Sequence, residues 1–303
     1  MLDSVLHIAV LVLFPPLLLG IINRTKALFA GRRGAPIVQP YRDLARLLRK
    51  GAVYSRTTTW VFRAGPMIAL ASAIVAGLIL PLVTPRAPLG FAGDVIAFAY
   101  VLALGRFFTM AAALDTGSAF EGMGASREAA YSALAEPALF LALAVLCVPA
   151  AAASFSTALP ASAHGLPHPA LLAAAGALAV VLLAENSRMP VDDPNTHLEL
   201  TMIHEVMVLD HGGPDLAFVV YGSAVKLFVT AALLLHVLVP VPAGGGAVGL
   251  ALLLAGEVLV GVLVGAVEST MARLRLQRVP QLLIAASVFG AVGLAVQIFQ
   301  GRP

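Results

Sequence analysis

The sequence predicts an all-α, polytopic membrane protein with about eight transmembrane helices and further amphipathic helices on the cytoplasmic surface. Of its 303 residues, 60% are hydrophobic and only 12% are charged, whereas roughly 25% of the residues of a soluble domain are charged. The mean hydropathy is +0.94. Apolar runs of about twenty residues recur along the chain, and each is long enough to cross about 30 Å of hydrocarbon as a helix.

The predicted spans leave residues 1–303 as a single membrane domain. They run approximately Leu2–Ile22, Ala64–Val83, Asp94–Leu114, Arg127–Ala150, Pro169–Ala184, Pro214–Val239, Gly246–Glu268 and Val279–Phe299. The first is not expected to be a cleaved signal peptide, because Asp3 stands where such a peptide has basic residues. Segments 23–63, 115–126, 185–213 and 269–278 then share one side of the membrane.

Lysine and arginine residues give the orientation of these spans. Fifteen of the nineteen fall in the four shared segments or at their edges, two fall on the opposite side, and Arg106 and Lys226 fall within spans. Positively charged loops remain in the cytoplasm. We therefore expect a bacterial or archaeal cytoplasmic (inner) membrane protein with both termini outside and the loop 185–213 inside. The basic residues that give the net charge of +3 lie where this membrane topology requires them. We therefore expect a lipid bilayer, and no nucleic acid, as partner.

A basic amphipathic helix is predicted between the first two spans. Tyr41, Leu44 and Leu47 recur at helical spacing against Arg42 and Arg46, a pattern typical of a helix that lies on the membrane surface. Such a helix either anchors to lipid headgroups or docks a partner protein, and the sequence favours neither role.

Charged residues within the predicted spans are functional candidates, because each costs about 2.5–3.5 kcal/mol at the centre of a bilayer. The sequence places Arg106, Glu136, Lys226, Glu257 and Glu268 there. Burial favours the neutral form of a carboxyl group, so these glutamates are suited to taking up and releasing protons. The alternative is a purely structural ion pair in which Lys226 neutralises one glutamate.

The cytoplasmic stretch Glu185–Asp215 holds seven of the sixteen acidic residues. Thr196 and Glu199 fit a capping box and Gly212 fits a helix end, so we expect a helix over His197–His211. Alternating carboxylates and histidines suit proton relay, although a solvated connector has similar composition. No metal site is expected, because the histidines lack metal-ligand spacing, and a single cysteine in the chain cannot ligate an iron–sulfur cluster.

Four sequence blocks carry a resemblance to a known family. They are GRRGAPIVQPYRDLARLLRK, LDTGSAFEGMGASREAAYSALAEP, ENSRMPVDDPNTHLELTMIHEVMVLD and VESTMARLRLQRVPQ. In order and over nearly the whole chain, they resemble the membrane subunit of energy-converting group 4 NiFe hydrogenases and formate hydrogenlyases, of the hydrogenase-4 component C type. That subunit is homologous to the complex I subunit that joins the peripheral arm to the membrane arm.

The resemblance implies a membrane-anchoring and coupling subunit that is not catalytic alone. It would link redox chemistry in a peripheral arm to translocation of protons, or of sodium ions, along a glutamate-lined path. The implied partners are hydrogenase large and small subunits, iron–sulfur subunits and antiporter-like membrane subunits. The NiFe centre and iron–sulfur clusters are expected on those partners and no cofactor is expected in this chain. The alternatives are a quinone-site subunit of a complex I-like NADH dehydrogenase and a standalone ion transporter.

Two sets of site residues follow from the motifs and from the charges in the spans. The expected proton-relay and coupling residues are Glu136, Glu185, Asp192, Asp193, Glu199, Glu205, Lys226, Glu257 and Glu268. The expected peripheral-arm interface is Arg32, Arg33, Gln39, Arg42, Asp43, Asp115, Arg127, Glu128, Arg188, His197 and His204. Glu121 departs from the family pattern, which has a small residue there, and the sequence assigns it no role.

Overall fold

The computed structural model describes residues 2–162, 168–192, 202–239 and 246–300. Within these ranges the chain is helical and has no strand. The elements are α1 (Leu2–Leu13), α2 (Pro15–Phe29), α3 (Gln39–Leu48), α4 (Trp60–Ile79), α5 (Asp94–Asp115), α6 (Ala119–Cys147), α7 (Phe155–Ser162), α8 (Pro169–Glu185), η1 (Glu205–Val208), α9 (Gly213–Leu238), α10 (Gly246–Thr270), η2 (Leu276–Arg278) and α11 (Val279–Gln300). The predicted all-α class is confirmed.

The number of spans is six or seven rather than the expected eight by helix length and composition. Among the described residues, six helices are long and apolar enough to cross a membrane, and α1 with α2 make a seventh if this bent pair counts as one span. The remaining predicted span corresponds to α8, which is apolar but only 17 residues long. The count of eight is therefore not confirmed. Most predicted ends agree with the helix ends to within a few residues, but α2 ends at Phe29 instead of Ile22 and α6 begins at Ala119 instead of Arg127.

The first predicted span is broken in two. The axes of α1 and α2 differ by 44°, because Pro15 and Pro16 follow the break and have no N–H to donate to the preceding turn. The hydroxyl of Tyr221 donates instead to the carbonyl oxygen of Val12 at 2.7 Å. The hydroxyl of Tyr41 donates to the carbonyl oxygen of Leu13. Side chains of α9 and α3 thus supply donors that the helix itself lacks.

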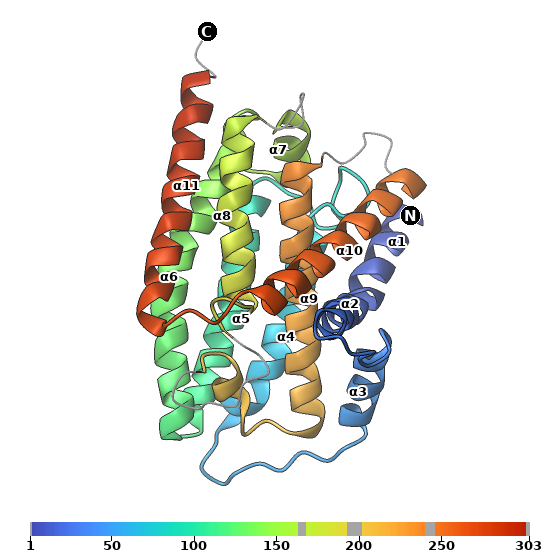
Figure 1. Cartoon of the computed structure of the whole chain (residues 1–303), viewed down its shortest axis with the longest axis vertical. Helices are drawn as coiled ribbons and strands as arrows, with labels where there is room; N and C mark the ends of the chain where they lie inside the picture. The colour runs from blue at the N-terminus through green and yellow to red at the C-terminus, as the bar shows by residue number, and fades with distance from the viewer. Residues whose placement is uncertain (1, 163–167, 193–201, 240–245, 301–303) are drawn as a thin grey trace.

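Helix α9 is the centre of the bundle. It packs against α2, α4, α8 and α10, and its residues 227–237 are almost all buried. Figure 1 shows α6, α8 and α11 on one side of α9 and α1, α2, α3 and α10 on the other. Helix α10 crosses the bundle obliquely and packs closely on α2, since a Cβ atom at Gly265 would lie 2.8 Å from Cβ of Thr25. Small residues allow this approach between membrane helices.

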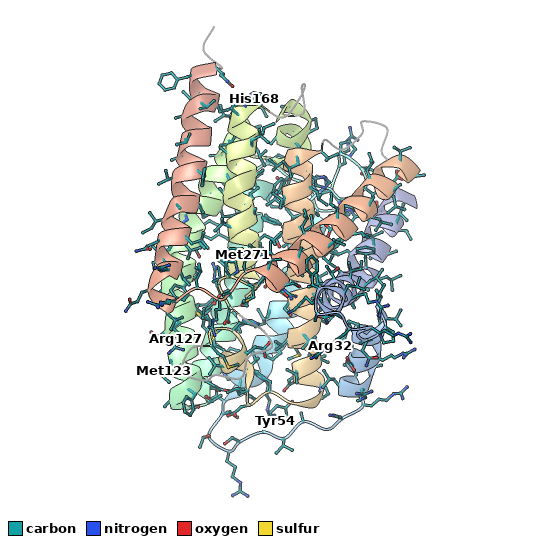
Figure 2. All side chains as sticks on the ribbon, in the orientation of Figure 1. Arg32, Tyr54, Met123, Arg127, His168 and Met271 are labelled. Carbon is teal, nitrogen blue, oxygen red and sulfur yellow. The ribbon has the colours of Figure 1, made fainter. Side chains whose placement is uncertain are left out.

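The two ends of the bundle differ in charge. Arg32, Tyr54 and Arg127 lie at the lower end in Figure 2, and His168 lies at the upper end. We call the lower end, which carries α3, η1 and the segment between α3 and α4, the charged end. The predicted amphipathic segment forms helix α3, which confirms that it is helical. None of the residues of α3 is buried.

The helix expected over His197–His211 does not form over the part that the structure describes. Residues 193–201, with the predicted capping box, lie outside the described ranges, and residues 202–211 contain only the short 3-10 helix η1. Tertiary contacts explain this difference. The carboxylate of Asp192 accepts the backbone N–H groups of Ile203 and His204, each at 3.1 Å, and Gly124 of α6 approaches so closely that a Cβ there would lie 2.9 Å from Met207. These contacts hold the backbone in a turn against α6.

Candidate functional site

A buried ion-pair cluster links four helices in the half of the bundle nearer the charged end. Arg106 of α5 donates one guanidinium nitrogen to Glu136 of α6, at 2.5 Å, and the other to Glu185 at the end of α8. The second carboxylate oxygen of Glu185 lies 3.8 Å from Nζ of Lys226 on α9. We call these four residues the central cluster.

The members of the central cluster differ in exposure. The side chain of Arg106 is 8% exposed and that of Glu185 is 12% exposed, whereas that of Glu136 is 43% exposed. Two buried charges are stable together only if they are paired and hydrogen-bonded, because desolvation of each costs several kcal/mol. Arg106 therefore neutralises Glu185 inside the bundle and holds Glu136 at its side.

Four cavities meet at the central cluster. The one nearest the charged end has a volume of about 280 Å³ and is lined by Glu185, Arg188, Glu205 and Lys226 among others. Two smaller ones have volumes of about 50 and 10 Å³, and a fourth of about 80 Å³ lies beside Glu136. A water molecule needs roughly 10–15 Å³ and two or more polar partners. Polar side chains with room for water thus extend from the charged end to Glu136.

The outer part of the fourth cavity is aromatic. Tyr100 and Phe140 line it together with Arg106 and Glu136, and their ring centroids are 6.1 Å apart. Both rings are exposed on the outside of the bundle. The Glu136 carboxylate therefore lies in a gap between α5 and α6 that is framed by aromatic side chains.

A second ion-pair cluster lies between α2 and α10. The carboxylate of Glu268, which is fully buried, lies 2.8 Å from Nζ of Lys26 and 3.3 Å from the guanidinium group of Arg188. This cluster connects α2 and α10 to the segment that follows α8. Glu268 was expected to act in proton relay, and the structure shows it held by two cations.

Glu257 is in a different situation from the other glutamates. It lies halfway along α10, is completely buried, and neither of its oxygens has a hydrogen-bond partner among the described residues. Its neighbour Gly256 packs against Leu235 of α9, because a Cβ there would lie 2.9 Å from that side chain. Glu257 is thus separate from both ion-pair clusters.

Among the described histidines, His204 lines the cavities at the central cluster. It lines both the 280 Å³ cavity and the 50 Å³ cavity. Burial, reinforced by the positive charges of Lys226 and Arg188, lowers the pKa of His204 to about 4. The imidazole is therefore neutral at neutral pH, with one nitrogen to donate and one to accept a hydrogen bond.

Asp192 anchors the loop that carries His204. It is almost completely buried, and besides the two backbone N–H groups it binds the guanidinium group of Arg273 at 2.8 Å. On the opposite side, the N–H of Asp210 donates to the carboxylate of Glu121 at 3.1 Å. Glu121, to which the sequence assigned no role, therefore ties this loop to α6.

The residues expected at a peripheral-arm interface fall into three groups. Arg32, Arg33 and Arg42 are exposed at the charged end, and Gln39 donates to Asp43 at 2.9 Å on the exposed helix α3. Others have structural contacts: Asp115 accepts the N–H groups of Thr59 and Phe62, Arg127 donates to the carbonyl oxygen of Met202, and Arg188 binds Glu268. Glu128 and His204 line cavities inside the bundle. His197 of this set lies outside the described ranges, as do Asp193 and Glu199 of the proton-relay set.

The structure adds Arg106 to the expected site. The sequence identified Arg106 as a charge within a span but placed it in neither set of site residues. Arg106 is separated from Glu185 by 79 positions, so no local pattern joins the two. The sequence signal for Arg106 is the energetic cost of placing a charged side chain within a membrane span. Across the ranges that the structure describes, no group of three or more His, Cys, Asp or Glu side chains could hold a metal ion.

Comparison with known proteins shows the family to which the chain belongs. The model of the family described as NADH dehydrogenase matches residues 2–298. The chain belongs to the NADH dehydrogenase family. Formate hydrogenlyase subunit 4 of Escherichia coli (strain K12) is 34% identical over 308 residues, which cover 96% of this chain and 97% of that protein. Hydrogenase-4 component C of the same organism is 34% identical over 236 residues, which cover 76% of this chain and 73% of that protein.

A solved structure has the same fold. It is a chain in the membrane-bound sulfane sulfur reductase (MBS), an archaeal respiratory membrane complex, with a TM-score of 0.81, 21% identity and 98% coverage of each chain. At this identity the match establishes the fold alone. The resemblance to hydrogenase and formate hydrogenlyase membrane subunits is confirmed, and the chain is a multi-pass membrane protein whose relatives belong to multisubunit membrane complexes.

Proposed function

We propose that this protein is the membrane-anchoring and coupling subunit of a group 4 hydrogenase or formate hydrogenlyase-type complex. It links redox chemistry in a peripheral arm to translocation of protons, or of sodium ions. The two Escherichia coli relatives, of which one aligns over 96% of the chain, support this assignment. The charged end faces the cytoplasm, both termini face outward, and the peripheral arm docks on the charged end.

The observation that carries the proposal is the central cluster with its cavities. It connects the 280 Å³ cavity at the charged end to Glu136, which lies in the middle of α6. A change of charge or conformation in the docked arm would act on Glu185 and Lys226 at the near end of the cluster. Arg106 would transmit this change to Glu136, since one guanidinium group binds both carboxylates.

Glu136 also indicates where the path continues. Its side chain is 43% exposed at the side of the bundle, and a lipid-facing charge in the hydrocarbon region is costly. A neighbouring membrane subunit with a polar side chain at this level would cover it. Antiporter-like membrane subunits are the proposed neighbours, and the ion leaves this chain laterally towards them.

The electron carriers are proposed on the partners. The chain has one cysteine, Cys147, so it cannot supply the set of cysteine ligands that an iron–sulfur cluster needs. Hydrogenase large and small subunits and iron–sulfur subunits would hold the NiFe centre and the clusters. This chain contributes titratable groups and a platform.

The decisive experiment is purification of the complex through a tag on this chain, followed by reconstitution into vesicles. We expect hydrogenase and antiporter-like subunits to co-purify and hydrogen- or formate-linked turnover to drive ion uptake. Glu136→Gln should retain assembly and dye-linked hydrogenase activity but lose translocation, and Asp3→Asn, which changes an exposed carboxylate of α1, should retain all three. Co-purification with NADH dehydrogenase subunits and inhibition by quinone analogues would instead support a quinone-site subunit, and transport by the lone chain would support a standalone transporter.

A further inference from the structure

Glu128 lies inside the bundle, next to the central cluster. It is on α6, eight residues before Glu136 and thus about two helical turns away on a similar face. Glu128 lines the 50 Å³ cavity together with Arg106, His204 and Lys226, and it also lines the 10 Å³ cavity beside Asp192. This position is internal, whereas the sequence motifs suggested a surface role in docking.

Glu128 differs from Glu136 and Glu185 in having no hydrogen-bond or ion-pair partner among the residues that the structure describes. It forms no hydrogen bond or ion pair with any residue in the described ranges. Both terminal nitrogens of Arg106 are taken, by Glu136 and Glu185, and Nζ of Lys226 lies nearest to Glu185. The cations that could stabilise a charged Glu128 are therefore already engaged.

The other charged groups around Glu128 do not change this balance. Asp192 is neutralised by Arg273, and Arg188 is held by Glu268 together with Lys26. His204 is uncharged at neutral pH, since the pKa of its imidazole is lowered to about 4. Around Glu128 and the central cluster, what remains is three carboxylates, Glu128, Glu136 and Glu185, against the two cations Arg106 and Lys226.

We propose that Glu128 holds one exchangeable proton for this cluster, while Glu136 and Glu185 remain ionised against Arg106 and Lys226. With Glu128 protonated, the three carboxylates and two cations are electrically neutral; loss of the proton gives a net charge of −1 in a poorly hydrated site. The proton arrives from the 280 Å³ cavity. His204 lines both this cavity and the 50 Å³ cavity beside Glu128. This inference rests on the proposed coupling function and names the group that carries the proton in it.

Infrared spectroscopy of the full chain in lipid bilayers tests the protonation state directly, without any partner subunit. A protonated carboxyl group has a carbonyl stretching band that a carboxylate lacks. We expect this band to lose intensity at neutral pH in Glu128→Gln and to be unchanged in the exposed control Asp3→Asn. Glu257 contributes equally to all these variants, so the difference between wild type and variant isolates Glu128.

A second variant tests the charge balance and not merely the presence of Glu128. Glu185→Gln leaves two carboxylates against two cations, so Glu128 should ionise and the same band should be lost although Glu128 is intact. An unchanged band in Glu128→Gln would overturn the assignment. An unchanged band in Glu185→Gln would overturn the charge balance on which it rests.

The reconstituted complex then separates this inference from the proposed function. If wild-type vesicles translocate ions, Glu128→Gln should abolish translocation with dye-linked activity retained, and Glu128→Asp should restore part of it. Translocation by Glu128→Gln at the wild-type rate would overturn the inference and leave the coupling function intact. Failure of the wild-type complex to translocate would instead refute the proposed function, and the infrared bands would still decide where the proton is held.

Discussion

Replacing Arg106 by methionine tests whether the central cluster is an interdependent ion-pair network. The substitution keeps a long side chain and removes the charge that Glu185 and Glu136 share. Removal of one partner from a buried ion pair costs about 3–5 kcal/mol. The half-exposed Glu136 should add at most about 1 kcal/mol, since exposed pairs are weak, and Lys226 remains 3.8 Å from Glu185. We therefore expect a loss near the lower limit, about 3 kcal/mol, or roughly 5–10 °C in thermal midpoint.

A double-mutant cycle with Glu185→Gln gives the critical measurement. Thermal unfolding of the purified chain in detergent would be followed for wild type, Arg106→Met, Glu185→Gln and the double variant. Because the double variant removes both the buried charge of Glu185 and the cation that neutralises it, it should be more stable than the sum of the single losses predicts, with a coupling energy of about 1–3 kcal/mol. Strict additivity, or an Arg106→Met chain as stable as wild type, would refute the network.

Three further outcomes follow from contacts elsewhere in the site. Gly124→Ala should loosen the segment that carries η1 and destabilise the chain by about 1–3 kcal/mol, because the new methyl group would lie 2.9 Å from Met207 and overpacking is costly. In the control Gly122→Ala, no atom lies within 4 Å of the added methyl group, so this change should be neutral or stabilising. Hydrogen exchange and thermal unfolding of both variants would measure the difference. The folded-state pKa of His204 is about 4, below the ordinary value of 6.5. The free energy of unfolding should therefore fall as the pH drops from 6.5 to about 4, by up to about 3 kcal/mol. His204→Gln should remove this part of the pH profile. Glu268→Ala should lower the thermal midpoint by leaving its two cations unpaired, and Glu268→Gln should do so less; equal midpoints for wild type and both variants would show that this ion pair contributes no stability.

The sequence was sufficient for features that depend on local composition. Apolar runs located most helix ends to within a few residues, and the spacing of Tyr41, Leu44 and Leu47 identified α3 as an amphipathic helix. Charges within spans marked Glu136, Lys226 and Glu268, which the structure places in ion pairs. The helix predictions succeed because the 3.6-residue period is set by nearby residues, and the cost of a charge in lipid likewise marks candidate residues from the local sequence alone.

Features that depend on distant residues could not be predicted in this way. No local pattern joins Arg106 to Glu185, which is 79 positions away, and so Arg106, although marked as a charge within a span, entered neither set of site residues. The helix expected over His197–His211 was wrong over residues 202–211, because Asp192 and Gly124 determine the backbone there. Glu121 was noticed only as a departure from a motif; its bond to the N–H of Asp210 became visible only in three dimensions.

The break between α1 and α2 makes the inclination of the first span depend on residues outside it. An unbroken helix satisfies its own carbonyl groups, but here Tyr221 of α9 and Tyr41 of α3 donate to Val12 and Leu13. Lipid offers no substitute donor, so a shift of α3 at the charged end changes how favourable the bend is at that depth. The position of α3 is thus coupled to the bend of the first span through the hydroxyl group of Tyr41. Tyr41→Phe is the smallest change that would remove this coupling.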